Sequence, residues 1–405
     1  MKARSVLPTL ASILALVACN EKKAQPETPA PEPTSRAEAS ATPASAAAPS
    51  AAAPSAAAPS ASAEPAAAAG QPAKGLRAPN NDPEVVKQIT AVRDGCKWGR
   101  NEFVDACKPM QDWVEWASFP GRQDILSTLV ASLEDDSPAV RNIAAVGLEV
   151  IGTRPLSDAA LATALFDALD EERNPKNCRG IALQAAAVRL AETELDERAL
   201  KVARTHALSP CRVTLVGAFL AYNPQHYDFT IELAKSDKDP KVRAEAVAAM
   251  RGGAQKDATR QQNNCKVWRT LLDDAEPEVA ARAIELLGRT GGTAFDAPCV
   301  DEWNDLLTHV EAAASAGKAE STKLPWGVCG LFEQKKLTAE QRARALSLLQ
   351  TLVETSANAE ASRMSALDCI GRHDPDAKTF AQKFEQDAAA KVAKAAKAIL
   401  AAKPR

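Results

Sequence analysis

Apolar side chains recur at intervals of three and four residues from about position 120 to the end of the chain. In the stretch that begins at Pro138, for example, Val140, Ala144 and Leu148 would share one face of a helix. The chain is also rich in Ala and only 4% aromatic, which favours closely packed helices over β-sheet. The pattern therefore predicts an all-α fold.

A short turn pattern, with Asp followed by Pro and Val, introduces these predicted helices. Clear copies begin at Asp135, Asp237 and Asp274, and weaker copies begin near Pro175, Pro210, Pro325, Ser362 and Lys391. Proline fits the first turn of a helix but not its interior, so a copy with Pro predicts a helix start. A companion amphipathic helix fits between successive copies. The resulting units of about 35 residues must stack to bury their apolar faces.

This repeat resembles HEAT repeats, specifically the bacterial kind with an Asp-x-x-Pro-x-Val-Arg turn. The resemblance covers about residues 120–402 and implies an α-solenoid of about seven to eight HEAT-like helix pairs, with the helix after each turn on the concave face. In that family the turn Asp and Arg link neighbouring repeats. Structural roles are thereby implied for Asp135, Asp237, Asp274, Arg141, Arg212, Arg243 and Arg363. A basic stripe for an anionic ligand is the alternative, and Arg282 departs from the family position. Gly252-Gly253 and Gly291-Gly292 are expected to end helices.

The first twenty residues have the order of a secretory signal. Lys2 and Arg4 precede an apolar run that ends in Ala18-Cys19. A cysteine directly after the small residue resembles the lipobox of bacterial lipoproteins, which implies removal of residues 1–18 and a lipid on Cys19. An ordinary secretory signal or a signal-anchor helix is the alternative, although the apolar run is short for a membrane span. In the lipoprotein family, Asn20 in place of Asp favours the outer membrane.

Residues 19–80 are predicted to form a disordered Ala/Pro/Ser-rich tether. From position 20 to position 75 there is no Val, Ile, Leu, Met, Phe, Trp or Tyr, so little apolar surface is available to offset the cost of ordering. Residues 81–120 fit the repeat poorly and contain Trp98, Trp113 and Trp116. We interpret them as an aromatic helical N-terminal cap, with an exposed aromatic binding surface as the alternative. The solenoid is then expected over residues 121–405.

Eight cysteines follow the lipobox, an even number that favours disulfides in an exported protein. Taken in sequence order they form the pairs Cys96–Cys107, Cys178–Cys211, Cys265–Cys299 and Cys329–Cys369. The second and third pairs would tie equivalent helices of neighbouring repeats, whereas the fourth is expected at opposite ends of its helices. Sequence alone does not fix the connectivity, and buried reduced cysteines are the alternative. With four histidines and no Cys-x-x-Cys pair, no metal site is predicted.

The net charge of −3 argues against nucleic acid, which needs a concentrated basic surface. No phosphate-binding loop, serine elbow or His-Glu-x-x-His motif is present, so no catalytic residues and no cofactor are expected. We therefore expect a non-enzymatic, lipid-anchored scaffold whose concave surface binds a protein partner in the bacterial cell envelope, with the N-terminal lipid as its only membrane contact. The alternatives are an envelope enzyme, a chromophore lyase-like protein using the solenoid groove (phycobilin lyases share the repeat type), or a structural cell-surface component.

Overall fold

The computed structural model describes residues 82–103, 107–156, 158–187, 193–254, 257–289 and 299–402, which all belong to one compact unit. The predicted signal peptide, Cys19 and the predicted tether lie outside the described residues. The regular secondary structure of the described part consists of helices and one isolated β-bridge between Trp98 and Phe103. No helix in these ranges has the length and apolar character needed to cross a bilayer.

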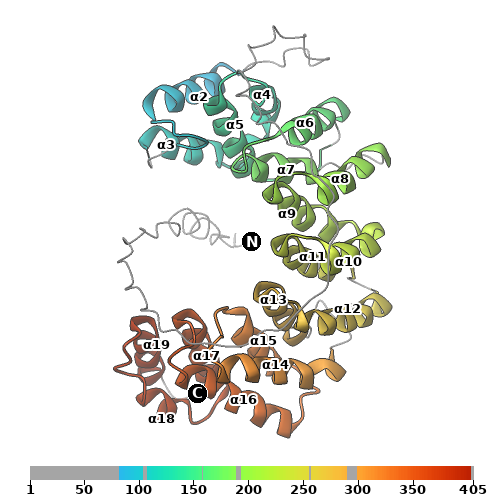
Figure 1. Ribbon diagram of the computed structural model, residues 1–405. Helices are drawn as coiled ribbons and strands as arrows, with labels where there is room; N and C mark the ends of the chain where they lie inside the picture. Colours follow the sequence, from blue (N-terminus) through green and yellow to red (C-terminus); the bar gives the residue numbers. More distant parts are fainter. Residues whose placement is uncertain are drawn as a thin grey trace, which may run out of the picture. The chain divides into compact units, whose positions relative to one another are not determined.

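The helices form two parallel rows, which Figure 1 shows most clearly between α6 and α13. The first row, which we call the inner row, contains the helices that follow the turns: α5 (Pro138–Val150), α7 (Cys178–Ala186), α9 (Ser209–Ala218), α11 (Pro240–Gly253), α13 (Pro277–Gly288), α15 (Lys323–Leu331), α17 (Glu360–His373) and α19 (Ala390–Ala401). The outer row contains their companions: α4 (Leu126–Ser132), α6 (Ala159–Glu171), α8 (Thr193–Thr205), α10 (Tyr227–Ser236), α12 (Ala258–Thr270), α14 (Trp303–Ser315), α16 (Ala339–Glu354) and α18 (Ala377–Gln382).

Each outer helix packs on the inner helix that follows it, and each inner helix packs on the next inner helix. This arrangement makes an all-α solenoid of eight helix pairs in the described ranges, which confirms the predicted fold class. Short 3₁₀ segments η1 (Arg122–Ile125), η2 (Leu220–Tyr222), η3 (Pro224–His226), η4 (Leu271–Asp273) and η5 (Val300–Glu302) join the helices. The apolar residues of both rows merge into one continuous core.

The proline turns start the inner helices as their sequence predicts. Helices α5, α11 and α13 begin at Pro138, Pro240 and Pro277, where the missing backbone N–H costs no helical hydrogen bond. At α11 the Asp239 carboxylate also accepts a hydrogen bond from the backbone N–H of Lys241, at 2.8 Å. In the weaker copies the helix can begin later. Helix α7, for example, begins at Cys178, three residues after its proline.

Two helices precede the solenoid, α2 (Pro83–Gly95) and α3 (Lys108–Ala117), and both pack against α5. Trp113 is fully buried there, and its indole Nε1 donates a hydrogen bond to the carbonyl of Ile143 at 3.2 Å. Apolar groups of α2 and α3 thus cover the end of the first pair, while Phe119, just beyond α3, stays exposed.

Glycines allow the closest contacts between inner helices. A Cβ atom on Gly288 of α13 would overlap the carbonyl oxygen of Gly327 on α15, and one on Gly330 would lie 2.7 Å from the carbonyl oxygen of Gly288. Gly252 has the same role, since its Cβ would overlap the carbonyl oxygen of Ala221. The expectation that Gly252-Gly253 cap the end of their helix is wrong, because both lie within α11 and the C-cap is Ala254. Residues 291 and 292 lie outside the described ranges.

Four disulfides join the cysteines in sequence order. Their Cα atoms are 5.7 Å apart in Cys96–Cys107, 4.5 Å in Cys178–Cys211, 5.3 Å in Cys265–Cys299 and 5.8 Å in Cys329–Cys369. The bonds link the residue after α2 to the residue before α3, α7 to α9, α12 to the residue before η5, and α15 to α17. Four disulfides indicate an oxidising compartment outside the cytoplasm.

Two of these bonds differ in detail from the expectation. Cys265 lies in the middle of α12 whereas Cys299 precedes η5, so their positions are not equivalent. Cys329 and Cys369 both lie towards the C-terminal ends of their helices, not at opposite ends. The reason is that α15 spans only nine residues and ends at Leu331.

Candidate functional site

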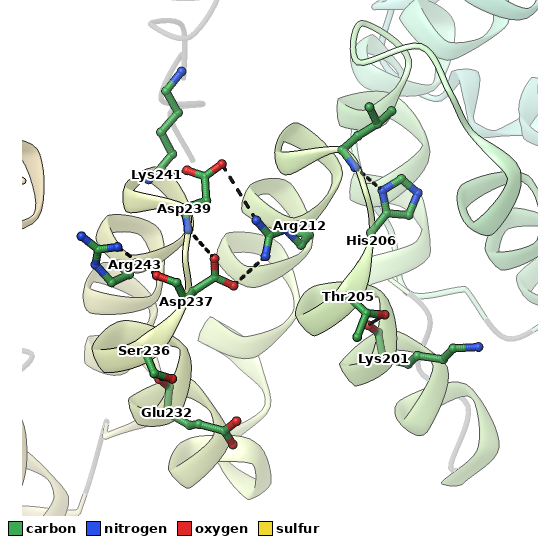
Figure 2. A network of polar contacts seen from close by, with 11 residues as sticks. Lys201, Thr205, His206, Arg212, Glu232, Ser236, Asp237, Asp239, Lys241 and Arg243 are labelled. Carbon is green, nitrogen blue, oxygen red and sulfur yellow. Dashed lines mark hydrogen bonds and ion pairs between the residues drawn. The ribbon is translucent and has the colours of Figure 1, made fainter. Parts of the chain in front are cut away.

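An ion pair between neighbouring repeats recurs at several of the repeat turns. Arg212 of α9 donates a hydrogen bond to Asp237 at 2.7 Å, and both side chains are only 4% exposed. A second carboxylate, Asp239, lies 3.9 Å from the same guanidinium, as Figure 2 shows. Arg243 of α11 in turn donates two hydrogen bonds to Asp274, at 3.0 and 2.7 Å. These arginines are used inside the fold, so they do not form an exposed basic stripe.

The same contact recurs at the end of the solenoid. Arg363 of α17 donates to both carboxylate oxygens of Asp387, at 3.1 and 2.6 Å, and its Nε donates to the carbonyl of Val353 at 2.8 Å. Within the described ranges, two other arginines of the repeat turns form no such ion pair with a neighbouring repeat. Arg141 donates to carbonyls of its own turn, and Arg282 pairs with Glu285 at 2.9 Å within its own helix.

Replacement of Asp387 by Asn should destabilise the protein at pH 7 by about 1.5–3 kcal/mol, the range for a hydrogen bond to a charged group. Hydrogen bonds from Arg363 hold the pKa of Asp387 below its usual range, although partial burial opposes them. A carboxylate with a lowered folded-state pKa stabilises the fold above its unfolded value of about 3.9, and the stabilisation is lost as the pH falls through the folded value. The deficit should therefore shrink below about pH 4.

Urea midpoints at pH 7 and pH 3 test this, with the exposed Asp376→Asn as control. A deficit of equal size at both pH values would contradict the argument.

A surface depression lies on the inner row of the solenoid. This groove has a volume of about 630 Å³. Its walls come from the segment after α5, from α7, α9 and η2, and from α11. The lining residues are Thr153, Arg154, Pro155, Arg179, Leu183, Ala186, Ala187, Val213, Thr214, Gly217, Ala218, Tyr222 and Glu245. The groove thus combines a floor of small apolar side chains with separated charges.

The aromatic ring at this groove is unusually accessible. Tyr222, in η2, is 72% exposed, although Phe219 and Leu220, just after α9, are buried. Arg154 and Arg179 bring positive charge to the groove, and Arg179 is also paired with Glu149 at 2.9 Å. Tyrosine and arginine are both enriched at protein-binding surfaces.

Glu245 supplies the negative charge of the groove. Its side chain rests on Gly217, where a Cβ atom would meet the carboxylate. Among the described residues it forms no hydrogen bond or ion pair. Burial raises the pKa of Glu245, and the positive charges of Arg282 and Lys323 oppose this effect in part. A half-buried carboxylate without a close partner is suited to accept a hydrogen bond from a ligand.

We expect Glu245→Gln to stabilise the protein slightly at pH 7. A carboxyl group whose folded-state pKa is raised costs stability once it ionises, so the cost is absent below the unfolded pKa of about 4.3 and complete above the folded value. The gain should therefore vanish near pH 4. Thermal unfolding at the two pH values measures it, with the exposed Glu385→Gln as control. Destabilisation at pH 7 would show that Glu245 is a structural residue.

Two smaller depressions repeat the combination of an exposed aromatic side chain with arginine. One, of about 370 Å³, lies beside Trp116, Phe119 and Arg122, where the guanidinium stacks 3.8 Å from the centre of the Trp116 ring. The other, of about 310 Å³, lies on the inner row beside Trp326 and Arg372. The first depression lies in the segment for which an exposed aromatic surface is the alternative to a cap, and it includes Trp116 and Phe119. No local sequence motif marks the residues of the other depressions.

The predicted site residues are placed as follows. Cys19 lies outside the described ranges. The other eight cysteines are all in disulfides, so the two described clusters that contain sulfur, Cys329 with Cys369 and His373 and Cys265 with Cys299 and Glu302, offer no thiolate to a metal in this state.

No protein-family model and no curated protein matches this chain. Among solved structures, YibA of Escherichia coli is 14% identical with a TM-score of 0.41, over 76% of this chain and 100% of YibA. Importin beta is 11% identical with a TM-score of 0.44, over 79% of this chain and 46% of importin beta. An engineered protein is 16% identical with a TM-score of 0.33, over 78% of this chain and 98% of its own. The assignment to the α-solenoids rests on the stacked helix pairs themselves.

Proposed function

We propose that this protein is a non-enzymatic scaffold that binds a peptide segment of a partner protein in the groove on its inner row. The observation that carries the proposal is the groove at α7, α9 and α11, with Tyr222 exposed at it and Glu245 lacking a close partner among the described residues. Extended stacks of helical repeats present such surfaces without using the lining residues for stability.

The charges define the kind of segment that fits. A basic side chain of the partner would meet the carboxylate of Glu245, and an acidic side chain or carboxylate would meet Arg154 and Arg179. The small apolar side chains between them, such as Ala186 and Ala218, leave room for aliphatic groups. The partner segment is therefore expected to carry both signs of charge around an apolar centre.

A binding role is favoured over catalysis by the chemistry of the groove. Its lining, as described above, contains no histidine, cysteine or serine, and its one carboxylate has no second titratable acid beside it in the lining. The hydroxyl groups of the lining belong to Thr153, Thr214 and Tyr222, and the lining holds no histidine to activate them as nucleophiles.

We further propose that the scaffold is anchored in the bacterial cell envelope through a lipid on Cys19. The four disulfides support an oxidising compartment, and the N-terminal lipobox pattern supports a lipid anchor. The test is metabolic labelling with a fatty acid analogue. Label should enter the wild type and not Cys19→Ala, and equal labelling of both would exclude this anchor.

Site-specific photo-crosslinking in cells tests the groove. A photoreactive phenylalanine analogue at position 222 should capture a defined partner. The same analogue at Lys266, exposed on the outer helix α12, should not capture it. A partner captured equally from both positions would contradict binding in the groove, and a captured pigment or metal-containing group would favour the enzyme or lyase alternative.

Tyr222→Ala should weaken binding of the captured partner at least tenfold, equivalent to about 1.4 kcal/mol, because accessible tyrosines at the centre of an interface commonly contribute this much. The affinity is measured by calorimetry with purified proteins. Lys266→Ala is the matched control and should bind like the wild type. An unchanged affinity for Tyr222→Ala would place the binding surface elsewhere on the solenoid.

A further inference from the structure

The disulfide between Cys329 and Cys369 differs from the others in its surroundings. It joins the inner helices α15 and α17 and borders the depression of about 310 Å³ beside Trp326. That depression is lined by Arg289, Trp326, Cys329, Gly330, Glu333 and Arg372. Cys329 is therefore the residue of this pair that lines the depression, with 6% of its surface exposed, whereas Cys369 is fully buried.

Cationic and titratable groups contact this bond. The Nη2 atom of Arg372 lies 3.5 Å from Sγ of Cys329, and a ring nitrogen of His373 lies within 4.8 Å of both sulfur atoms. The imidazole is held by stacking on Phe332, with ring centres 5.0 Å apart. The other charged groups here are Arg289 and Glu333, which line the depression, and Asp368, which pairs with Arg372 at 3.1 Å.

The two other disulfides within the solenoid are less accessible. Cys178, Cys211 and Cys265 have no exposed surface, and Cys299 is 1% exposed, compared with 6% for Cys329. A thiol can reach these buried bonds only after local unfolding, whereas it can approach Cys329 through the depression. The Cys96–Cys107 bond is also accessible, but Arg372 is not beside it. Its reduction rate therefore measures the effect of exposure alone.

We propose that Cys329–Cys369 is a thiol–disulfide exchange site for a partner protein that carries a reactive dithiol. The partner thiolate attacks Sγ of Cys329, a mixed disulfide forms, and Cys369 leaves as a thiolate that takes a proton from solvent. The second thiol of the partner then attacks the mixed disulfide, so that Cys329 is released and the partner is oxidised. Two electrons pass from the partner to the cysteine pair.

The positive charge of Arg372 favours this reaction for two reasons. It attracts the incoming thiolate, and it stabilises the negative charge that spreads over the sulfur atoms during exchange. Reduction would remove the covalent link between α15 and α17 while their packing contacts remain. The inner row would then change its local rigidity beside Trp326 without losing its fold.

The experiment follows each disulfide separately in the oxidised full chain. The protein is incubated with dithiothreitol, samples are quenched with an alkylating reagent, and the reduced fraction of each pair is read by mass spectrometry. We expect Cys329–Cys369 to open at least tenfold faster than Cys178–Cys211. Arg372→Gln should slow the opening of Cys329–Cys369 at least threefold and leave the Cys96–Cys107 rate unchanged. Arg344→Gln, which removes an exposed cation on α16 paired with Glu311, is the matched control.

Two results would overturn the proposal. Opening of Cys329–Cys369 at the same rate as Cys178–Cys211 would mean that both wait for unfolding. An Arg372→Gln rate equal to those of the wild type and Arg344→Gln would mean that Arg372 does not assist exchange. Far-ultraviolet circular dichroism and an unchanged Cys178–Cys211 rate establish that the variant keeps its fold.

Discussion

Replacing Asp237 by Ala should destabilise the protein by about 3–5 kcal/mol, the usual cost of leaving a buried charge without its partner. The guanidinium of Arg212 is almost completely buried and donates a 2.7 Å hydrogen bond to Asp237. Asp237 also accepts the backbone N–H of Asp239 at 2.8 Å, so the substitution loses part of the turn as well. Urea unfolding followed by circular dichroism measures the change.

The matched control is Asp136→Ala, an exposed aspartate in the corresponding turn before α5, which should change the stability by no more than about 0.5 kcal/mol. The double variant Arg212→Met/Asp237→Ala gives a second check. It removes both charges, so it should recover much of the loss. A single variant that loses less than about 1 kcal/mol would show that Arg212 finds solvent or another acceptor.

Gly288→Ala should destabilise the protein by about 1–3 kcal/mol or more, because the added methyl group would overlap the carbonyl oxygen of Gly327. The backbone oxygen has little freedom to move, so α13 and α15 would have to separate. Gly253→Ala is the matched control. Its Cβ would lie 3.3 Å from a ring carbon of Tyr227, a contact that a small side-chain movement relieves. Equal unfolding midpoints for the two variants would contradict this account of the helix contact.

The fold was largely predictable because its signals are local. Proline in the clear copies of the turn marks a helix start, and Pro138, Pro240 and Pro277 each begin a helix. The apolar spacing gave the number of helix pairs, since each pair must bury its face against the next. The ion pairs of Arg212 and Arg243 followed from the family resemblance.

The remaining features depend on contacts between distant residues. Asp387 pairs with Arg363, but it precedes a turn without proline, so the repeat pattern does not mark it. Gly252 was expected only to cap a helix. Its close contact with Ala221 is made between inner segments of two successive repeats, and the sequence does not show it. The groove joins Arg179, Tyr222 and Glu245 from three successive repeats. None of them carries a local signal, and only the stacking brings them together.

The disulfides also determine how the chain responds to mechanical force. A chain pulled from its two ends lengthens as repeats unfold, but a segment closed by a disulfide cannot contribute to that length. Cys178–Cys211 encloses a sequence separation of 33 residues, which would otherwise extend by about 110 Å at ~3.4 Å per residue. The separations of 34 residues for Cys265–Cys299 and 40 for Cys329–Cys369 remove comparable lengths. The oxidised solenoid is therefore a much less extensible molecule than its reduced form.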